Sequence, residues 1–164
     1  MRILGIDPGL HITGYGLVET DLSRTKVIEA GIIRTSEKDT MAAKLREIST
    51  GLEGLISQFK PDAIAVEDLY SHYDHPKTAI IMGHARGVIF LKAAEANIDV
   101  FPYASTRIKK SLTGNGRASK NQVQMMIKSA LGLDDIPEPP DTADALAIAL
   151  CHCRALAHNN EVLQ

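Results

Sequence analysis

Apolar residues recur along this chain of 164 residues in two kinds of spacing, one typical of strands and one typical of helices. The short apolar runs that predict strands lie at residues 2–7, 11–19, 25–35, 63–67 and 98–103. The longer stretches that predict helices lie at about 41–59, 77–96, 105–112, 119–131 and 141–158. Three hairpin-linked strands followed by alternating helices and strands indicate an α/β fold, with a mixed five-stranded sheet flanked by helices.

The start of the chain, with its three hairpin-linked strands, is not that of a dinucleotide-binding Rossmann sheet. Such a sheet alternates strand and helix from the start, and no G-x-G-x-x-G sequence follows residues 2–7. The length and a hydrophobic content of 45% indicate one domain with one core. We expect this domain to span residues 1–158, with a short tail at 159–164.

The sequence predicts neither a secretion signal nor a membrane anchor. Asp7 interrupts the first apolar run before it reaches signal length, and the apolar run at 145–151 is far too short to span a bilayer. Cys151 and Cys153 lie two positions apart in a predicted helix, so they point to different faces and are expected to be buried thiols. We therefore expect a cytoplasmic protein without a membrane partner.

Basic and acidic residues are separated in the last third of the chain. The net charge is −2, yet residues 100–133 contain no Asp or Glu. The basic residues of this segment are Arg107, Lys109, Lys110, Arg117, Lys120 and Lys128. Acidic residues follow at once, from residue 134 onward. This boundary predicts a surface that holds a polyanion beside a site that holds cations.

Four carboxylates stand at the ends of predicted elements. Asp7 ends the first strand and Glu67 ends the fourth, while Asp141 and Asp144 share one face at the start of the last helix. Each has an ordinary explanation when taken alone. Asp7 suits a turn before a Pro-Gly pair, Glu67 marks where a strand leaves the core, and the two helical aspartates suit capping.

Together the four carboxylates predict a metal site. Carboxylates that converge at the edge of a core repel one another and lose solvation, which a fold tolerates when cations lie between them. Such hard oxygen ligands suit Mg²⁺ or Mn²⁺, and two ions of this kind can clamp a phosphodiester and activate a water. The basic segment would then hold the backbone of a nucleic acid.

Five separated blocks of the sequence resemble, in order, the RuvC family of Holliday-junction resolvases: GIDPG with TGYG, then AIAVE, GHARG, IKKSLTGNGRASKNQV and DTADALAIALCH. The resemblance covers nearly the whole chain. It implies an RNase H-like fold, a homodimer, and Mg²⁺-dependent paired nicks across a four-way DNA junction that leave 5'-phosphate and 3'-hydroxyl ends, in recombination and repair. It also implies the branch-migration proteins RuvA and RuvB as partners.

The resemblance assigns roles to particular residues. The family's catalytic and metal-binding carboxylates fall on Asp7, Glu67, Asp141 and Asp144, and its phosphate-contacting lysines fall on Lys109 and Lys120. Charge alone would explain these lysines equally well as a solvated helix face, but the lack of acidic neighbours favours DNA contact. The same basic segment adds three further candidates for DNA binding, which are Arg107, Lys110 and Arg117.

The loop after the fourth strand differs from the family pattern. Tyr70 stands where the family commonly places a Phe that stacks on a junction base, and a Tyr can stack as well. The segment 71–76 is one residue longer than the pattern and adds Tyr73, together with His72 and His75. We therefore predict that Tyr70 or Tyr73 contacts the junction, with packing inside the loop as the alternative.

A stripe of small residues runs along the predicted helix at 77–96. Ala79, Gly83 and Gly87 recur at four-residue spacing, so another backbone can come close to this face. Packing against the chain's own sheet would explain the stripe equally well. The family resemblance favours a dimer interface.

Three other functions are compatible with parts of the pattern. GIDPG plus a hairpin is similar to the first phosphate motif of actin- and sugar-kinase-type ATP-binding folds, but this chain is too short for their second domain and lacks a second Asp-Gly phosphate loop. A related RNase H-like nuclease acting on RNA is disfavoured by the paired acids Asp141 and Asp144 and by the basic stretch 107–128. A module that only binds branched DNA would have lost a carboxylate, and none is missing here.

Overall fold

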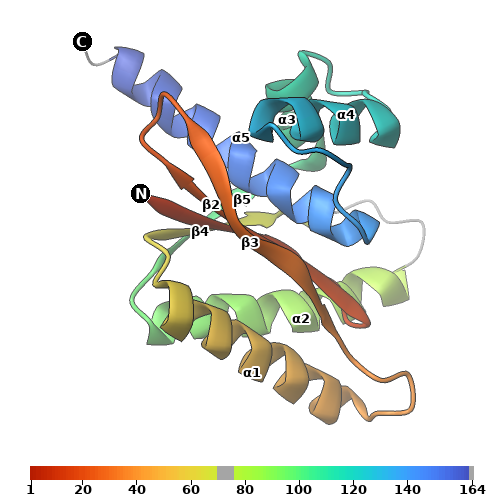
Figure 1. The fold of residues 1–164 in the computed structure, drawn as a ribbon. Helices are drawn as coiled ribbons and strands as arrows, with labels where there is room; N and C mark the ends of the chain where they lie inside the picture. Colours follow the sequence, from red (N-terminus) through yellow and green to blue (C-terminus); the bar gives the residue numbers. More distant parts are fainter. Residues whose placement is uncertain (70–75, 163–164) are drawn as a thin grey trace.

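The computed structural model describes residues 1–69 and 76–162, which form a five-stranded sheet with helices on both sides (Figure 1). The strands are β1 (Arg2–Asp7), β2 (Ile12–Thr20), β3 (Thr25–Arg34), β4 (Ala63–Glu67) and β5 (Asp99–Tyr103). The helices are α1 (Met41–Phe59), α2 (Pro76–Glu95), α3 (Ser105–Thr113), α4 (Lys120–Leu131) and α5 (Pro140–Val162). Every predicted element is present close to its predicted bounds, except that α5 continues to Val162 and so into the segment expected as a tail.

The sheet is mixed, with strand order β3-β2-β1-β4-β5. β1, β2 and β3 pair antiparallel as consecutive hairpins, whereas β4 joins β1 and β5 joins β4 in parallel. α5 lies along one face with α3 and α4 beside it, and α1 and α2 cover the other face (Figure 1). The predicted mixed sheet flanked by helices is therefore confirmed.

β1 and β4 lie inside the sheet, and both of their faces are buried. Alternate side chains divide between two cores: Ile3 and Ala65 pack on the side of α5, whereas Leu4 and Ile64 pack on the side of α1 and α2. Burial on both faces explains why these strands are continuous apolar runs in the sequence. The alternation also fixes the side on which the last residue of each strand emerges.

Two glycines let α5 lie close against the sheet. A side chain on Gly5 of β1 would collide with the backbone oxygen of Ala145. A side chain on Gly14 of β2 would likewise collide with the backbone oxygen of Asp141. The start of α5 therefore packs directly against the backbone of β1 and β2. Larger residues at these two positions would force the helix farther from the sheet.

β5 forms an edge of the sheet and contains a proline. The Asp68 N–H donates a hydrogen bond to the Tyr103 carbonyl oxygen over 2.9 Å, so the backbone groups of Tyr103 point toward β4. Alternate residues of a strand point their backbone groups to opposite sides. Pro102 therefore points outward, where its missing N–H costs no bond to β4.

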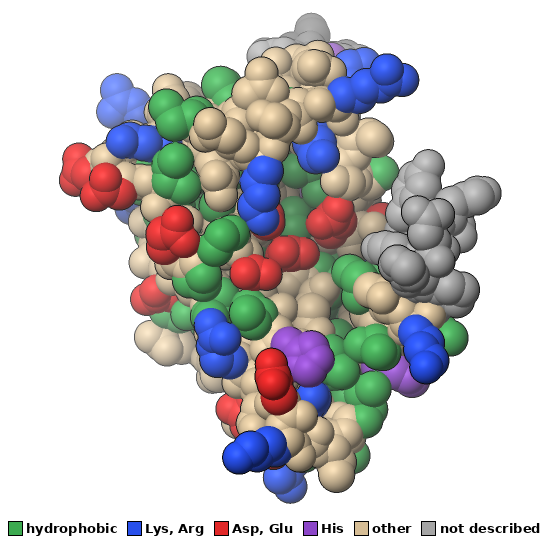
Figure 2. All heavy atoms as spheres, turned by 90° about the vertical axis from the view of Figure 1, so that its right-hand side faces the viewer, with side chains coloured by type: hydrophobic (Ala, Val, Ile, Leu, Met, Phe, Trp, Pro, Cys, Tyr) green, Lys and Arg blue, Asp and Glu red, His purple; other side chains and the backbone are tan. Residues whose placement is uncertain are grey.

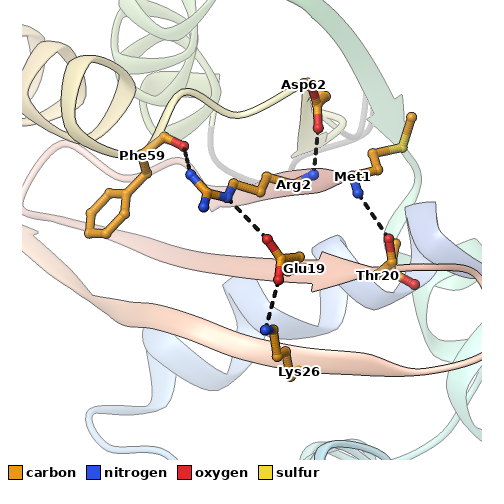
Figure 3. Close-up of polar contacts among 7 residues, drawn as sticks. All are labelled: Met1, Arg2, Glu19, Thr20, Lys26, Phe59 and Asp62. Atoms are coloured by element: carbon orange, nitrogen blue, oxygen red, sulfur yellow. Dashed lines mark hydrogen bonds and ion pairs between the residues drawn. The ribbon is translucent and has the colours of Figure 1, made fainter.

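The end of the sheet at which β1 begins is fastened by polar contacts (Figure 3). The Arg2 backbone N–H donates to Asp62 over 2.6 Å. The Arg2 guanidinium donates to Glu19 over 3.3 Å and to the Phe59 carbonyl oxygen over 2.8 Å. Glu19 also forms an ion pair of 2.8 Å with Lys26. These contacts join three strands to the end of α1 and to the segment before β4.

None of the helices in the described ranges is long and apolar enough to cross a membrane. Cys151 and Cys153 are free and buried in α5, as the sequence predicted. Burial raises the pKa of the Cys153 thiol to about 11. This thiol is therefore neutral at physiological pH.

Candidate active site

Asp7 and Glu67 end neighbouring parallel strands. Ile6 of β1 is in register with Val66 of β4, so the next residues along the two strands, Asp7 and Glu67, come side by side. Both emerge on the α5 side of the sheet, because side chains alternate along a strand and Ile3 of β1 packs on that side. Parallel neighbours are only about 4.8 Å apart, which brings the two carboxyl groups close together.

The first turns of α5 add two more carboxylates. Gly14 is paired with Asp7 across β1 and β2, and the backbone of Asp141 lies directly over Gly14. Asp144 follows three positions later, on the same side of the helix as Asp141. The charges of Glu67, Asp144 and Asp141 all act on Asp7. The structure therefore brings together the four carboxylates that are far apart in the sequence.

The electrostatics of this cluster are unfavourable. The pKa of Asp7 is raised from 3.8 to about 7, mainly because the carboxyl group is buried and further because the other three acids repel its charge. Burial also raises the pKa of Glu67, against the opposing effect of the Ser105 hydroxyl, which lines the same pocket. Crowded acids with raised pKa values mark a place where a cation would be strongly attracted.

Basic side chains stand next to the acids. Figure 2 shows acidic side chains gathered in the middle of one face, with Lys and Arg side chains above them. The Lys120 Nζ lies 2.9 Å from an Asp144 oxygen, and this hydrogen bond is the main cause of the raised pKa of Lys120. The charge of Lys109 acts on Glu67. These four residues line one pocket of about 210 Å³ between α3, α4 and α5.

The donors of the cluster fit a hard divalent cation. All four are carboxylates, whose oxygens are the ligands that Mg²⁺ and Mn²⁺ prefer. In their present positions, the side chains of the described ranges form no group of three or more His, Cys, Asp or Glu that could hold an ion. Asp144 instead pairs with the Lys120 ammonium, so an incoming ion and Lys120 would compete for this carboxylate.

The family model of the crossover junction endodeoxyribonuclease RuvC matches residues 3–152 of this chain. The chain belongs to the RuvC family. The RuvC proteins of Rhodopirellula baltica and Caldicellulosiruptor saccharolyticus are 52% and 47% identical to it, over 91% and 93% of this chain and 84% and 92% of their own lengths. The structure of Thermus thermophilus RuvC in complex with Holliday junction substrate matches with a TM-score of 0.91 at 32% identity, covering 97% of this chain and 96% of that one.

Membership of the RuvC family confirms the predicted resemblance, the RNase H-like fold and the nuclease class. RuvC nucleases depend on a metal ion. A cluster of crowded carboxylates at the strand ends is the kind of site that such a dependence requires.

Several residues predicted to bind DNA do not line the pocket that contains Glu67 and Asp144. The Arg107 guanidinium lies over the Tyr103 ring, 4.9 Å from its centre. Lys110 on α3 and Arg117 in the turn before α4 are exposed to solvent. Their contacts with DNA stay predictions. Two further candidates lie outside the described residues, and these are Tyr70 and Tyr73.

Two further residues at this RuvC site carry no signal in the sequence pattern. Ser105, the first residue of α3, lines the same pocket as Glu67 and opposes the rise of the pKa of its carboxyl group. Arg86 of α2 donates a hydrogen bond of 2.9 Å to Asp68, the residue after Glu67. Both contacts depend on how distant elements pack, so no local spacing of residue types could have indicated them.

Proposed function

We propose that this chain resolves four-way DNA junctions by paired symmetric nicks that leave 5'-phosphate and 3'-hydroxyl ends, in recombination and repair. The observation that carries the proposal is the convergence of four carboxylates beside two lysines. A relative with 32% identity was solved with a Holliday junction substrate, which supports a junction as the substrate here. We assign the nuclease to residues 1–158.

We assign Mg²⁺, with Mn²⁺ as a substitute, to Asp7, Glu67, Asp141 and Asp144, at two ions per site. Bound ions of this kind activate a water and stabilise the leaving oxygen of a phosphodiester. Asp7 and Glu67 contribute from the ends of rigid strands, and the two other aspartates approach from α5. A divalent charge would offset the burial and the repulsion that raise the pKa of Asp7, so Asp7 would bind in its ionised form.

We propose that Lys109 and Lys120 hold phosphates of the strand that is cut. Both line the pocket that also contains Glu67 and Asp144, and the Lys120 side chain is 57% exposed. An ammonium in such a position can contact a phosphate without being removed from solvent first. We extend the DNA surface to Arg107, Lys110 and Arg117, and assign base stacking at the crossover to Tyr70 or Tyr73.

We infer a homodimer that forms through the outward face of α2. Resolving a junction requires two cuts, and a two-fold dimer presents two identical sites. Ile80 and Leu91 of α2 are 62% and 56% exposed, which is high for large apolar residues. A side chain on Gly87 would meet no described atom within 4 Å, and one on Gly83 would meet only Leu69. Packing on the chain's own sheet therefore does not account for these glycines.

Two further assignments accompany the family membership. We propose RuvA and RuvB as partners in branch migration. We also propose a cytoplasmic location, which suits the free thiols of Cys151 and Cys153 because such thiols persist in a reducing compartment.

Incubation with a synthetic four-way junction, a linear duplex and an RNA–DNA hybrid, each with and without Mg²⁺, tests the proposed function. We expect paired nicks in the junction alone, only with Mg²⁺, and products that a ligase can reseal. Cutting of the hybrid in preference to the junction would point to an RNA-directed nuclease. Tight junction binding without any cutting would point to a binding module.

A further inference from the structure

Glu67 has a hydroxyl neighbour in addition to its acidic neighbours. Ser105 and Glu67 line the same pocket of about 210 Å³, and the Ser105 hydroxyl opposes the rise of the pKa of the Glu67 carboxyl group. Lys109 lies four positions after Ser105, so the two share a face of α3, and Lys109 also acts on Glu67. One face of α3 therefore presents both a hydroxyl and a positive charge to this carboxylate.

The fold holds Ser105 in place through short connections. Tyr103, two residues earlier, is paired with Glu67 across β4 and β5. The Ala104 carbonyl oxygen accepts a hydrogen bond of 3.0 Å from the Ile108 N–H, which closes the first turn of α3. Ile108 is itself buried in the core. The backbone of Ser105 is therefore fixed relative to the end of β4, although its side chain remains open to solvent.

We propose that Ser105 is a positioning residue for Glu67, whose hydroxyl holds one carboxylate oxygen so that the other is directed to the divalent cation. This proposal rests on the proposed function, in which Glu67 is a metal ligand. A Glu side chain has three torsions between backbone and carboxylate, and it loses rotamer freedom when it is fixed. Because Ser105 restricts these torsions before the ion arrives, it lowers the cost of binding.

The variants Ser105→Ala and Ser105→Thr, with Thr106→Ala as the matched control, test this role. Thr106 is the next residue of α3 and is equally exposed, but no contact joins its side chain to Glu67 among the interactions described here. Calorimetric titration of Mn²⁺ into the protein without DNA measures the affinity directly. Losing a hydrogen bond to a ligating carboxylate weakens metal binding by about 10- to 100-fold, which we expect for Ser105→Ala. Ser105→Thr, which keeps the hydroxyl, should bind Mn²⁺ within a few-fold of wild type.

Single-turnover cleavage of a junction gives a second measurement. Ser105→Ala should need more Mg²⁺ for half-maximal rate and should approach the wild-type rate at saturating Mg²⁺, while its junction affinity in EDTA stays unchanged. An Mn²⁺ affinity of Ser105→Ala equal to that of Thr106→Ala would overturn the proposal, as would a Ser105→Thr variant as weak as Ser105→Ala. If wild type failed to cut any junction, the proposed function would be refuted, and the Mn²⁺ titrations would still decide the role of Ser105.

Discussion

The two ends of the central sheet differ in how their charged side chains are paired. Where β1 begins, Glu19 lies between Arg2 and Lys26, and Asp62 accepts a backbone N–H (Figure 3). Where β1 ends, at Asp7, four acids converge with Lys120 as a cationic partner at one of them. β1 therefore begins at a neutralised end of the sheet and finishes at a crowded one.

The difference shows what each end contributes. Opposite charges in contact lower the free energy of the fold slightly, and this happens at the beginning of β1. Like charges buried together raise it, as the pKa of Asp7 records. A fold that keeps such a cluster gains no stability from it without a cation, so the crowded end is explained by what it binds.

Removing the charge of Asp7, at the crowded end of the sheet, should have the largest effect on junction cleavage. Asp7→Asn should reduce junction cleavage by about 10³-fold or more, because a neutral amide is a poor ligand for a hard cation. Junction binding should persist, since the substitution removes a repulsion from the phosphate. Cleavage rates and gel-shift binding measure the two effects. A variant that cuts at the wild-type rate would contradict the assignment of Asp7.

The pH dependence of stability should report the same crowding. Between its unfolded pKa of 3.8 and its folded pKa of about 7, Asp7 keeps a proton in the folded state that the unfolded chain has lost. Stability in EDTA should therefore fall as pH rises through this window, by up to about 4 kcal/mol, and stay level above it. Urea unfolding of wild type and Asp7→Asn measures the effect, because the variant lacks this contribution. If Asp7→Asn is instead much less stable than wild type at every pH, Asp7 serves mainly to cap its turn.

The distance between α5 and the sheet can be changed without substituting a charged residue. Gly14→Ala places a methyl group against the Asp141 backbone, so the start of α5 must shift. We expect a loss of about 1–3 kcal/mol in stability from overpacking, with a larger relative loss of cleavage because Asp141 and Asp144 move together. Gly54→Ala is the control, since a side chain there meets no described atom within 4 Å. Equal behaviour of the two variants in cleavage would show that this contact does not position the acids.

Lys120 provides a smaller test, with Lys26 of the neutralised end as its counterpart. Lys120→Ala should weaken binding to all junction sequences alike, and reduce the slope of log K against log salt by about one, the value for one lost phosphate contact. Lys26→Ala removes the same charge from the opposite end of the sheet and should leave the slope unchanged. Fluorescence anisotropy at several salt concentrations measures both. Identical slopes for the two variants would place Lys120 away from the DNA.

The smallest effect is expected at the neutralised end itself. Glu19→Gln removes the ion pairs with Arg2 and Lys26, which are partly exposed and therefore weak. Thermal unfolding should show a fall of the melting temperature by a few degrees at most, with junction cleavage unaffected. A loss of cleavage would show that the two ends of the sheet are coupled.

Local sequence patterns were sufficient to predict the helices and strands, and to single out the four carboxylates as one group. The sequence predicts that Asp7 and Glu67 converge, and the β1–β4 register brings the two strand ends together. The ion pair of Lys120 with Asp144 was not predicted, because residue type indicates a charge and not its partner. The contact of Ser105 with Glu67 requires the β4–β5 pairing, which only the whole fold determines.

Pro102 has a consequence for how copies of this protein behave when they are crowded. A bare sheet edge invites a strand of another molecule to pair with it, which is a common start of aggregation. On the outward side of β5, Pro102 removes a donor, so this edge cannot be extended by a regular ladder of hydrogen bonds. Many copies can therefore gather on one DNA molecule without joining sheet to sheet along β5.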